Sequence, residues 1–203
     1  MDGFERRKEQ SKEEIRKAAW ELFSQFGVDR VSVADIARKA GVSQATIYNN
    51  FGSKDAIARE FVTGAVEHLM TRVEEVLAPN LPYREKMAAF LQFIADMMAS
   101  GRPSTAETTL FASSVDVQND PEIRKIRTAA RERMTGLMLS LVKEGRQQGQ
   151  VDTSISDNAL AIYFGAFMDI FSYPELQSRF FNHPNIVKEL GALMMFGLKG
   201  ENR

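Results

Sequence analysis

A short stretch near the N-terminus groups polar side chains that can hydrogen-bond to nucleic-acid bases and phosphates. Residues 43–54 read SQATIYNNFGSK, and a helix through them can present several amide and hydroxyl groups on one face. The residues concerned are Gln44, Thr46, Tyr48, Asn49 and Asn50. Glutamine and asparagine can form paired hydrogen bonds with adenine, and hydroxyl groups can hold phosphates without charge repulsion.

Two short helices joined by a tight turn must position this stretch. Ser32 and Asp35 form a capping-box-like pair that predicts the start of the first helix, and Gly41 predicts its end. Ser43 can cap a second helix over residues 44–50. We expect Ile47 and Phe51 to face inward there, and the following residues to face outward: Gln44, Ala45, Asn49 and Asn50. An ordinary helical hairpin shares this pattern, but it has no need to expose so many polar groups together.

The composition describes a globular protein and excludes several kinds of site. The 203 residues are 44% apolar and 26% charged, with no cysteine and a net charge of −1. Disulfides and thiolate metal sites are therefore impossible, and His68 and His183 lie too far apart in sequence to indicate a histidine metal site. Nucleic-acid binding would need locally placed basic residues, such as Arg6, Arg7 and Lys8.

The whole chain is predicted to be all-α, with about nine helices and no strand. The expected helices span residues 8–26, 33–40, 44–50, 54–77, 83–100, 104–117, 121 to 145 or 149, 156–173 and 184–198. Residues 1–53 are expected to form a three-helix helix-turn-helix domain, and residues 54–203 a larger helical domain. Helix 54–77 is expected to connect the two. No signal peptide or transmembrane segment is apparent, so we expect no membrane association.

The last two predicted helices are apolar on nearly every side. A helix of this kind must be covered all round, so we expect one side to pack on its own domain and the other on a second copy of the chain. A deeply buried core of a monomer is the alternative. The residues predicted for a dimer interface are Ala159, Tyr163, Ala166, Ile170, Leu190 and Met194.

The first 60 residues resemble the DNA-binding domain of the tetracycline-repressor (TetR) family of bacterial transcriptional regulators. The resemblance covers about residues 10–60 and rests on Gly41, the Val42-Ser43 opening, the Thr46 and Tyr48 pair, and the exit Phe51, Ser53 and Lys54. Residues 61–203 match only in layout, including Leu-x-x-x-Gly and Gly-x-Val-Asp within 141–152. Gln44 and Asn49-Asn50 depart from the family pattern, so the resemblance does not supply the operator sequence.

The resemblance implies a homodimer that places two recognition helices in successive major grooves of a palindromic double-stranded DNA operator. Tyr48 and Lys54 are expected to hold phosphates, helped by Ser32, Ser43 and Thr46 at helix starts. Gln44, Ala45 and Asn49 are expected to face the bases. Arg6 and Arg7 are expected either to reach a minor groove or to belong to a solvated tail.

The resemblance also implies a small-molecule effector, most simply one that releases a repressor from DNA. Its pocket is expected among Met and Phe residues of the larger domain, although Met and Phe at helical spacing more often belong to a core than to a pocket. The candidates are Phe90, Phe93, Met97, Phe111, Met134, Met138, Phe164 and Met168, with the acidic Glu107 and Asp169 facing the ligand or an internal Arg or Tyr. We expect no cofactor, no enzyme activity and a cytoplasmic, nucleoid-associated protein. The alternatives are a regulator without an effector and a helical protein-interaction module.

Overall fold

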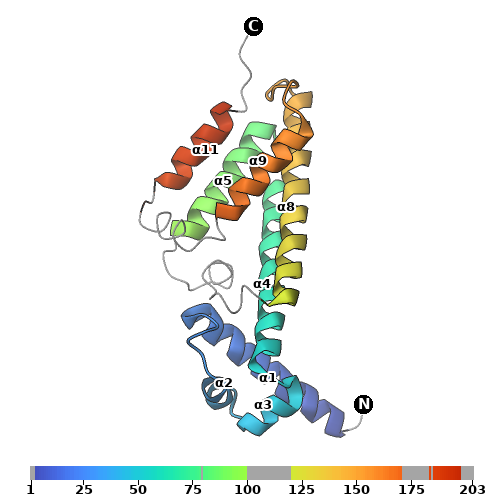
Figure 1. Cartoon of the computed structure of the whole chain (residues 1–203), viewed down its shortest axis with the longest axis vertical. Coiled ribbons are helices and arrows are strands. Elements are labelled where there is room, and N and C mark those ends of the chain that lie inside the picture. Colours follow the sequence, from blue (N-terminus) through green and yellow to red (C-terminus); the bar gives the residue numbers. More distant parts are fainter. Residues whose placement is uncertain (1–2, 79, 100–119, 171–182, 184, 198–203) are drawn as a thin grey trace. The chain divides into compact units, whose positions relative to one another are not determined.

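Every regular element in the described part of the chain is a helix. The computed structural model describes residues 3–78, 80–99, 120–170, 183 and 185–197. These residues form eight helices, shown in Figure 1. They are α1 (Gly3–Phe26), α2 (Val33–Ala40), α3 (Gln44–Phe51), α4 (Lys54–Leu77), α5 (Tyr83–Ala99), α8 (Pro121–Gln147), α9 (Asp157–Ile170) and α11 (Ile186–Gly197). The all-α prediction is confirmed, and none of these helices is long and apolar enough to cross a membrane.

The helix bounds follow the capping signals closely, with one clear exception. The helix α2 has the predicted bounds, as does α4, and α3 ends one residue later than expected. The helix α1 begins at Gly3 instead of residue 8, so our prediction of its start was wrong. Residues 5–10 are all exposed, and the first buried residue is Ile15. The first turns of α1 therefore carry no apolar periodicity to reveal them. The helix predicted over 104–117 lies outside the described residues.

The chain divides into two compact units. The first consists of described residues within Met1–Glu67 and Arg102–Ile126, and the second of those within His68–Gly101 and Arg127–Arg203. The helices α4 and α8 each contribute residues to both units. Our predicted division at residue 54 was based on sequence pattern alone, whereas the division by contacts assigns the first turns of α4 to the N-terminal unit.

In the first unit, α1 provides the apolar surface on which the other helices pack. Ile15 and Phe23 are fully buried. The ring of Phe61 on α4 meets Trp20 edge-on at 5.0 Å between centroids and Phe23 at 5.3 Å. Edge-to-face aromatic pairs of this kind add roughly 0.5–1.5 kcal/mol each beyond the area they bury. Trp20 therefore has a packing role in this unit.

In the second unit, the residues of α5 and α8 interlock near the C-terminal end of α8. The backbone N–H of Tyr83 donates to the side-chain oxygen of Gln148 at 2.9 Å, and Tyr83 is buried. Its ring lies against Gly145, where an added Cβ would come within 2.8 Å of the Tyr83 ring and 2.7 Å of Val151. A side chain at position 145 therefore has no room. Gly136, on the same helix, has open space around it.

These two glycines give opposite stability predictions. Gly145→Ala should destabilise the protein by about 1–3 kcal/mol, because the methyl group overpacks the contact between Tyr83 and Val151. Gly136→Ala should stabilise it by about 0.5–1 kcal/mol, because alanine loses less backbone entropy in a helix and meets no neighbour. Urea denaturation of both variants and the wild type measures the two changes. Equal effects of the two substitutions would contradict the packing at Gly145.

Candidate nucleic-acid interface

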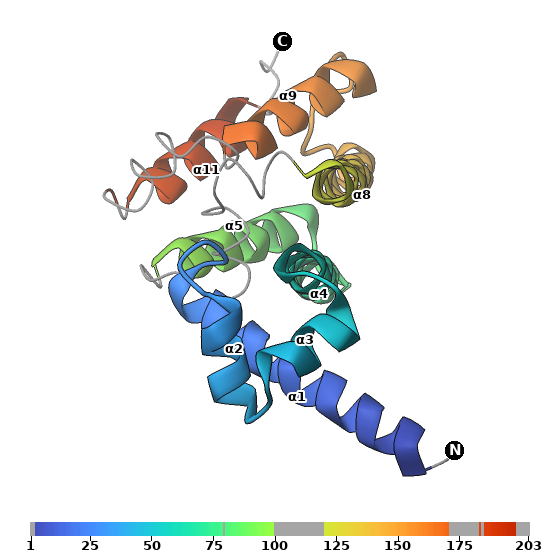
Figure 2. The same ribbon diagram turned by 60° about the horizontal axis from the view of Figure 1, so that its bottom comes forward.

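A tight turn at Gly41 sets the angle between α2 and α3. Gly41 has φ of +69°, a left-handed conformation that side chains disfavour, and its N–H donates to the carbonyl of Ala37. The N–H of Val42 donates to the same carbonyl at 3.0 Å. Ile36, Ala37 and Ile47 are buried between these helices and α1. Figure 2 shows α2 and α3 against α1.

The capping box predicted at the start of α2 is present. The backbone N–H of Asp35 donates to Ser32 Oγ at 3.2 Å, and the backbone N–H and hydroxyl of Ser32 donate to the Asp35 carboxylate at 3.0 and 2.5 Å. The hydrogen bonds from Ser32 lower the pKa of Asp35 below its ordinary value. A phosphate at this helix start would compete with Asp35 for the Ser32 hydroxyl. The predicted contact of Ser32 with DNA therefore requires its hydroxyl to donate to the phosphate in place of Asp35.

The second helix, α3, presents most of the predicted polar residues to solvent. Ser43 caps it by accepting the N–H of Thr46 at 3.1 Å, and the two hydroxyls lie 2.8 Å apart. Tyr48 is 50% exposed. Gln44, Ala45 and Asn49 are exposed, and Thr46 is half-buried. The exposed side chains leave their polar atoms available to a partner.

Two details of α3 differ from our expectation. Asn50 is half-buried, and its side-chain amide donates to the carbonyl of Thr46 at 2.9 Å. Its expected outward position was wrong, because an amide one turn after Thr46 can bond within its own helix. Phe51 is half-buried instead of fully inward.

A charged cluster and an ion pair fix these short helices to their neighbours. Arg16 on α1 donates to Glu60 on α4 at 2.9 Å and to Glu9 at 3.2 Å, and its guanidinium lies 5.8 Å from the centre of the Phe51 ring. The hydrogen bond to Glu60 raises the pKa of Arg16 further above its ordinary value. On the other side, Lys39 of α2 pairs with Glu21 of α1 at 2.7 Å. Arg16 therefore connects α1 with α4 and with the last residue of α3.

Lys54 opens α4 shortly after the end of α3. Gly52, with φ of +77°, ends α3, and Ser53 accepts the N–H of Ala56 at 3.2 Å and so caps α4. Lys54 is half-buried at this junction. Arg6 and Arg7 lie in the exposed first turns of α1, so the predicted solvated tail is helical from Gly3.

The residues predicted to line an effector pocket lie in the second unit where they are described. Phe90, Met134, Met138 and Phe164 are buried, and Phe93 and Met97 are half-buried. Glu107 and Phe111, and the side chains of Met168 and Asp169, lie outside the described residues. A pocket in this unit is lined instead by Glu74, Leu77, Ala78, Lys86, Leu137, Ser140, Leu141 and Glu144. That the Met and Phe residues named from the sequence line an effector pocket stays a prediction.

Substitution of Asp35 tests the capping box through pH. Because its native pKa is below the unfolded value of about 3.9, the ionised carboxylate stabilises the fold above that pH and loses this effect as pH falls through the native pKa. Asp35→Asn should therefore show a shallower loss of stability between about pH 5 and 2 than the wild type. Denaturant unfolding at several pH values measures both curves. Parallel curves would contradict the role of the carboxylate.

Comparison with known proteins identifies the N-terminal domain. Residues 15–61 match the model of bacterial regulatory proteins, tetR family. The HTH-type transcriptional repressor KstR2 of Rhodococcus jostii is 24% identical over 147 residues, covering 70% of this chain and 71% of that protein. The uncharacterized HTH-type transcriptional regulator YvdT of Bacillus subtilis is 36% identical over 84 residues, 41% of each chain.

A solved structure supports the same fold over nearly the whole chain. The TetR-family transcriptional regulator from Agrobacterium tumefaciens superposes with a TM-score of 0.72, covering 95% of this chain and 100% of that one at 15% identity. The family model matches the segment from the buried part of α1 into α4, which contains the helix-turn-helix. Residues 15–61 therefore form a DNA-binding domain of the tetR type, and the rest of the chain shares the fold of solved TetR-family regulators.

Proposed function

We propose that this regulator is a repressor that binds a palindromic operator as a homodimer through α3 and is released by a small molecule bound to its second unit. The observation that carries the proposal is the exposed polar face of α3, held on α1 by a buried apolar contact and a left-handed turn. KstR2, a relative of this chain, is named a transcriptional repressor, which supports repression as the mode of action.

The division of roles on α3 follows from its side chains. Gln44 and Asn49 carry amides that can pair with adenine, and the methyl group of Ala45 can meet a thymine methyl. Tyr48 lies within α3 and Lys54 follows its end, and both can bind phosphates beside the contacted bases. The side-chain amide of Asn50 already donates to a carbonyl within α3. We therefore assign base recognition to Gln44 and Asn49.

The homodimer is supported by an exposed apolar surface on α9 and α11. Ile162 is 74% exposed and Leu193 is 67% exposed, while Leu160 and Phe164, on α9, are buried. Large apolar side chains this exposed indicate a surface that a partner covers. Of the predicted interface residues, Ala159, Tyr163 and Ala166 are exposed and Leu190 is half-buried; the side chains of Ile170 and Met194 lie outside the described residues.

The operator contact is tested by titrating salt in a mobility-shift assay. DNA flanking the gene for this chain should be bound sequence-specifically. Lys54→Ala should weaken binding and reduce the slope of log K against log salt concentration by about 2 for a dimer, because each lost phosphate contact accounts for about one unit. Tyr48→Ala should also weaken binding.

Lys143→Ala is the matched control, since Lys143 is exposed on α8 in the second unit. It should leave both affinity and salt slope unchanged. Absence of specific binding to any genomic fragment would overturn the operator proposal, and an unchanged slope in Lys54→Ala would remove this lysine from the phosphate contacts.

The dimer surface is tested by placing a charge in it. Ile162→Asp should convert the dimer to a monomer and lower operator affinity by at least about a hundredfold, because two linked half-site contacts become independent. Sedimentation velocity and the mobility shift measure the two effects. Arg84→Asp, at an exposed position on α5, is the control and should remain dimeric. A wild-type chain that sediments as a monomer would contradict this part of the proposal.

A further inference from the structure

A buried lysine in the second unit has more hydrogen-bond donors than partners. The side chain of Lys86 on α5 is only 10% exposed, and its ammonium group donates to Glu144 on α8 at 2.7 Å. An ammonium group has three N–H donors. Within the described part of the chain, Glu144 is its one hydrogen-bond partner. Two donors of a nearly buried cation are thus left for another acceptor.

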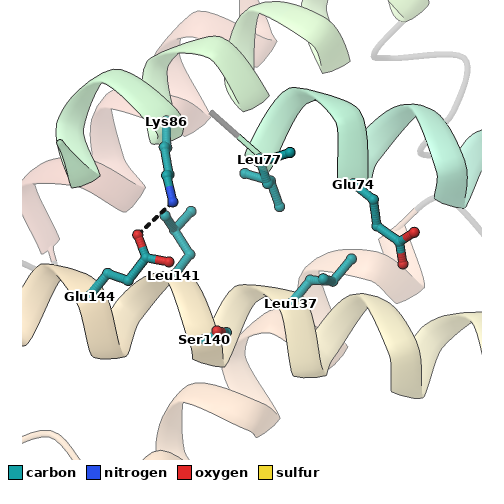
Figure 3. A pocket seen from close by; sticks show the side chains of 8 residues that line it. Glu74, Leu77, Lys86, Leu137, Ser140, Leu141 and Glu144 are labelled. Carbon is teal, nitrogen blue, oxygen red and sulfur yellow. Dashed lines mark hydrogen bonds and ion pairs between the residues drawn. The ribbon is translucent and has the colours of Figure 1, made fainter. Parts of the chain in front are cut away.

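This ammonium group lies at the wall of a pocket. Figure 3 shows Lys86 extending from α5 toward Glu144, with Leu77 of α4 and Leu137 and Leu141 of α8 around the same space. Ser140 of α8 and Glu74 of α4 complete much of the lining. Four of the eight lining residues are apolar and four are polar or charged, so the pocket places an apolar wall beside hydrogen-bonding groups.

The size of the pocket limits its ligand. Its volume is about 180 Å³. An apolar cavity of about 150 Å³ accepts a benzene molecule. A ligand of one six-membered ring, or an equally small branched chain, with one or two further atoms therefore fits.

The charges around the pocket select an uncharged ligand. The charge of Glu144 neutralises that of Lys86. Glu74 accepts a hydrogen bond from Arg133 Nε at 2.9 Å and forms an ion pair with Arg133 Nη2 at 2.8 Å. A ligand carboxylate at Lys86 would lie beside Glu144, and a ligand ammonium would lie beside Lys86; both meet a like charge at short range. An uncharged carbonyl oxygen is repelled by neither Glu144 nor Lys86. It can accept a hydrogen bond from an N–H of Lys86 that Glu144 does not bind.

We propose that the pocket lined by Lys86, Glu144, Leu77, Leu137 and Leu141 binds a small uncharged carbonyl compound, whose oxygen accepts a hydrogen bond from the Lys86 ammonium group. The role of this compound as the effector rests on the proposed function, whereas its binding does not. Because Leu77 and Ala78 stand at the end of α4, the ligand contacts the helix that begins at Lys54, beside the recognition helix.

Cyclohexanone is a suitable probe, and methylenecyclohexane has nearly the same shape without the oxygen. Ligand-observed NMR titration should show saturable binding of cyclohexanone to the full chain and at least about tenfold weaker binding of methylenecyclohexane. Lys86→Met should weaken the binding of cyclohexanone by about tenfold or more, as expected for loss of a charge-assisted hydrogen bond. The same substitution should leave the affinity for methylenecyclohexane unchanged.

A second pair of variants keeps the test valid where Lys86→Met unfolds because Glu144 loses its partner. Ser140→Phe should fill the pocket and abolish binding while the ion pair stays intact. Thr128→Phe, at an exposed position of α8 outside the lining, should bind cyclohexanone like the wild type. Absence of cyclohexanone binding, or equal affinity for the two probes, would overturn the inference.

The mobility shift separates this inference from the proposed function. Cyclohexanone binding that responds to Lys86 and Ser140 in a chain that binds no operator would support the pocket and overturn the regulator. Operator binding without any pocket-dependent cyclohexanone binding would support the regulator and overturn the pocket.

Discussion

The two helices of the helix-turn-helix have eight residues each, and helices this short are not stable alone in water. Their stability must come from burial on α1, where Ile36 and Ile47 each contribute roughly 1.5–3 kcal/mol. The angle between them is set by the left-handed turn at Gly41. Because the apolar contact uses the inner side of each helix, the polar outer side of α3 is spared from packing. The exposed polar face of α3, on which the proposed DNA contact rests, depends on this separation.

The sequence predicted best those features that depend on local chemistry. The capping box at Ser32 and the turn at Gly41 involve residues three or four positions apart, and both are present. The helix α8 begins at residue 121 as expected, where the Asp120 carboxylate accepts the N–H groups of Glu122 and Ile123. The early start of α1 was missed because its first turns have no apolar periodicity. The position of Asn50 was missed because an amide can turn either to solvent or to its own helix, and residue type alone does not decide between them.

The pocket at Lys86 shows why long-range features resist sequence reasoning. Its lining comes from α4, α5 and α8, and Lys86 meets Glu144 across 58 positions of sequence. Lysine on an amphipathic helix normally lies at the surface, and nothing in its immediate neighbours indicates burial. The apolar character of α9, in contrast, was visible in the sequence. The structure resolves its two sides: Leu160 is buried, whereas Ile162 is exposed.

A ligand at the end of α4 can affect operator binding only through its differential affinity for two conformations of the protein. A carbonyl compound of seven or so heavy atoms binds with modest affinity, so its differential affinity is smaller still. A hundredfold release of operator requires about 2.7 kcal/mol of coupling. One charge-assisted hydrogen bond to Lys86, present in one conformation and absent in the other, is worth about that much. Under the two proposals together, the partnered state of a single buried ammonium group is sufficient in magnitude to release the operator.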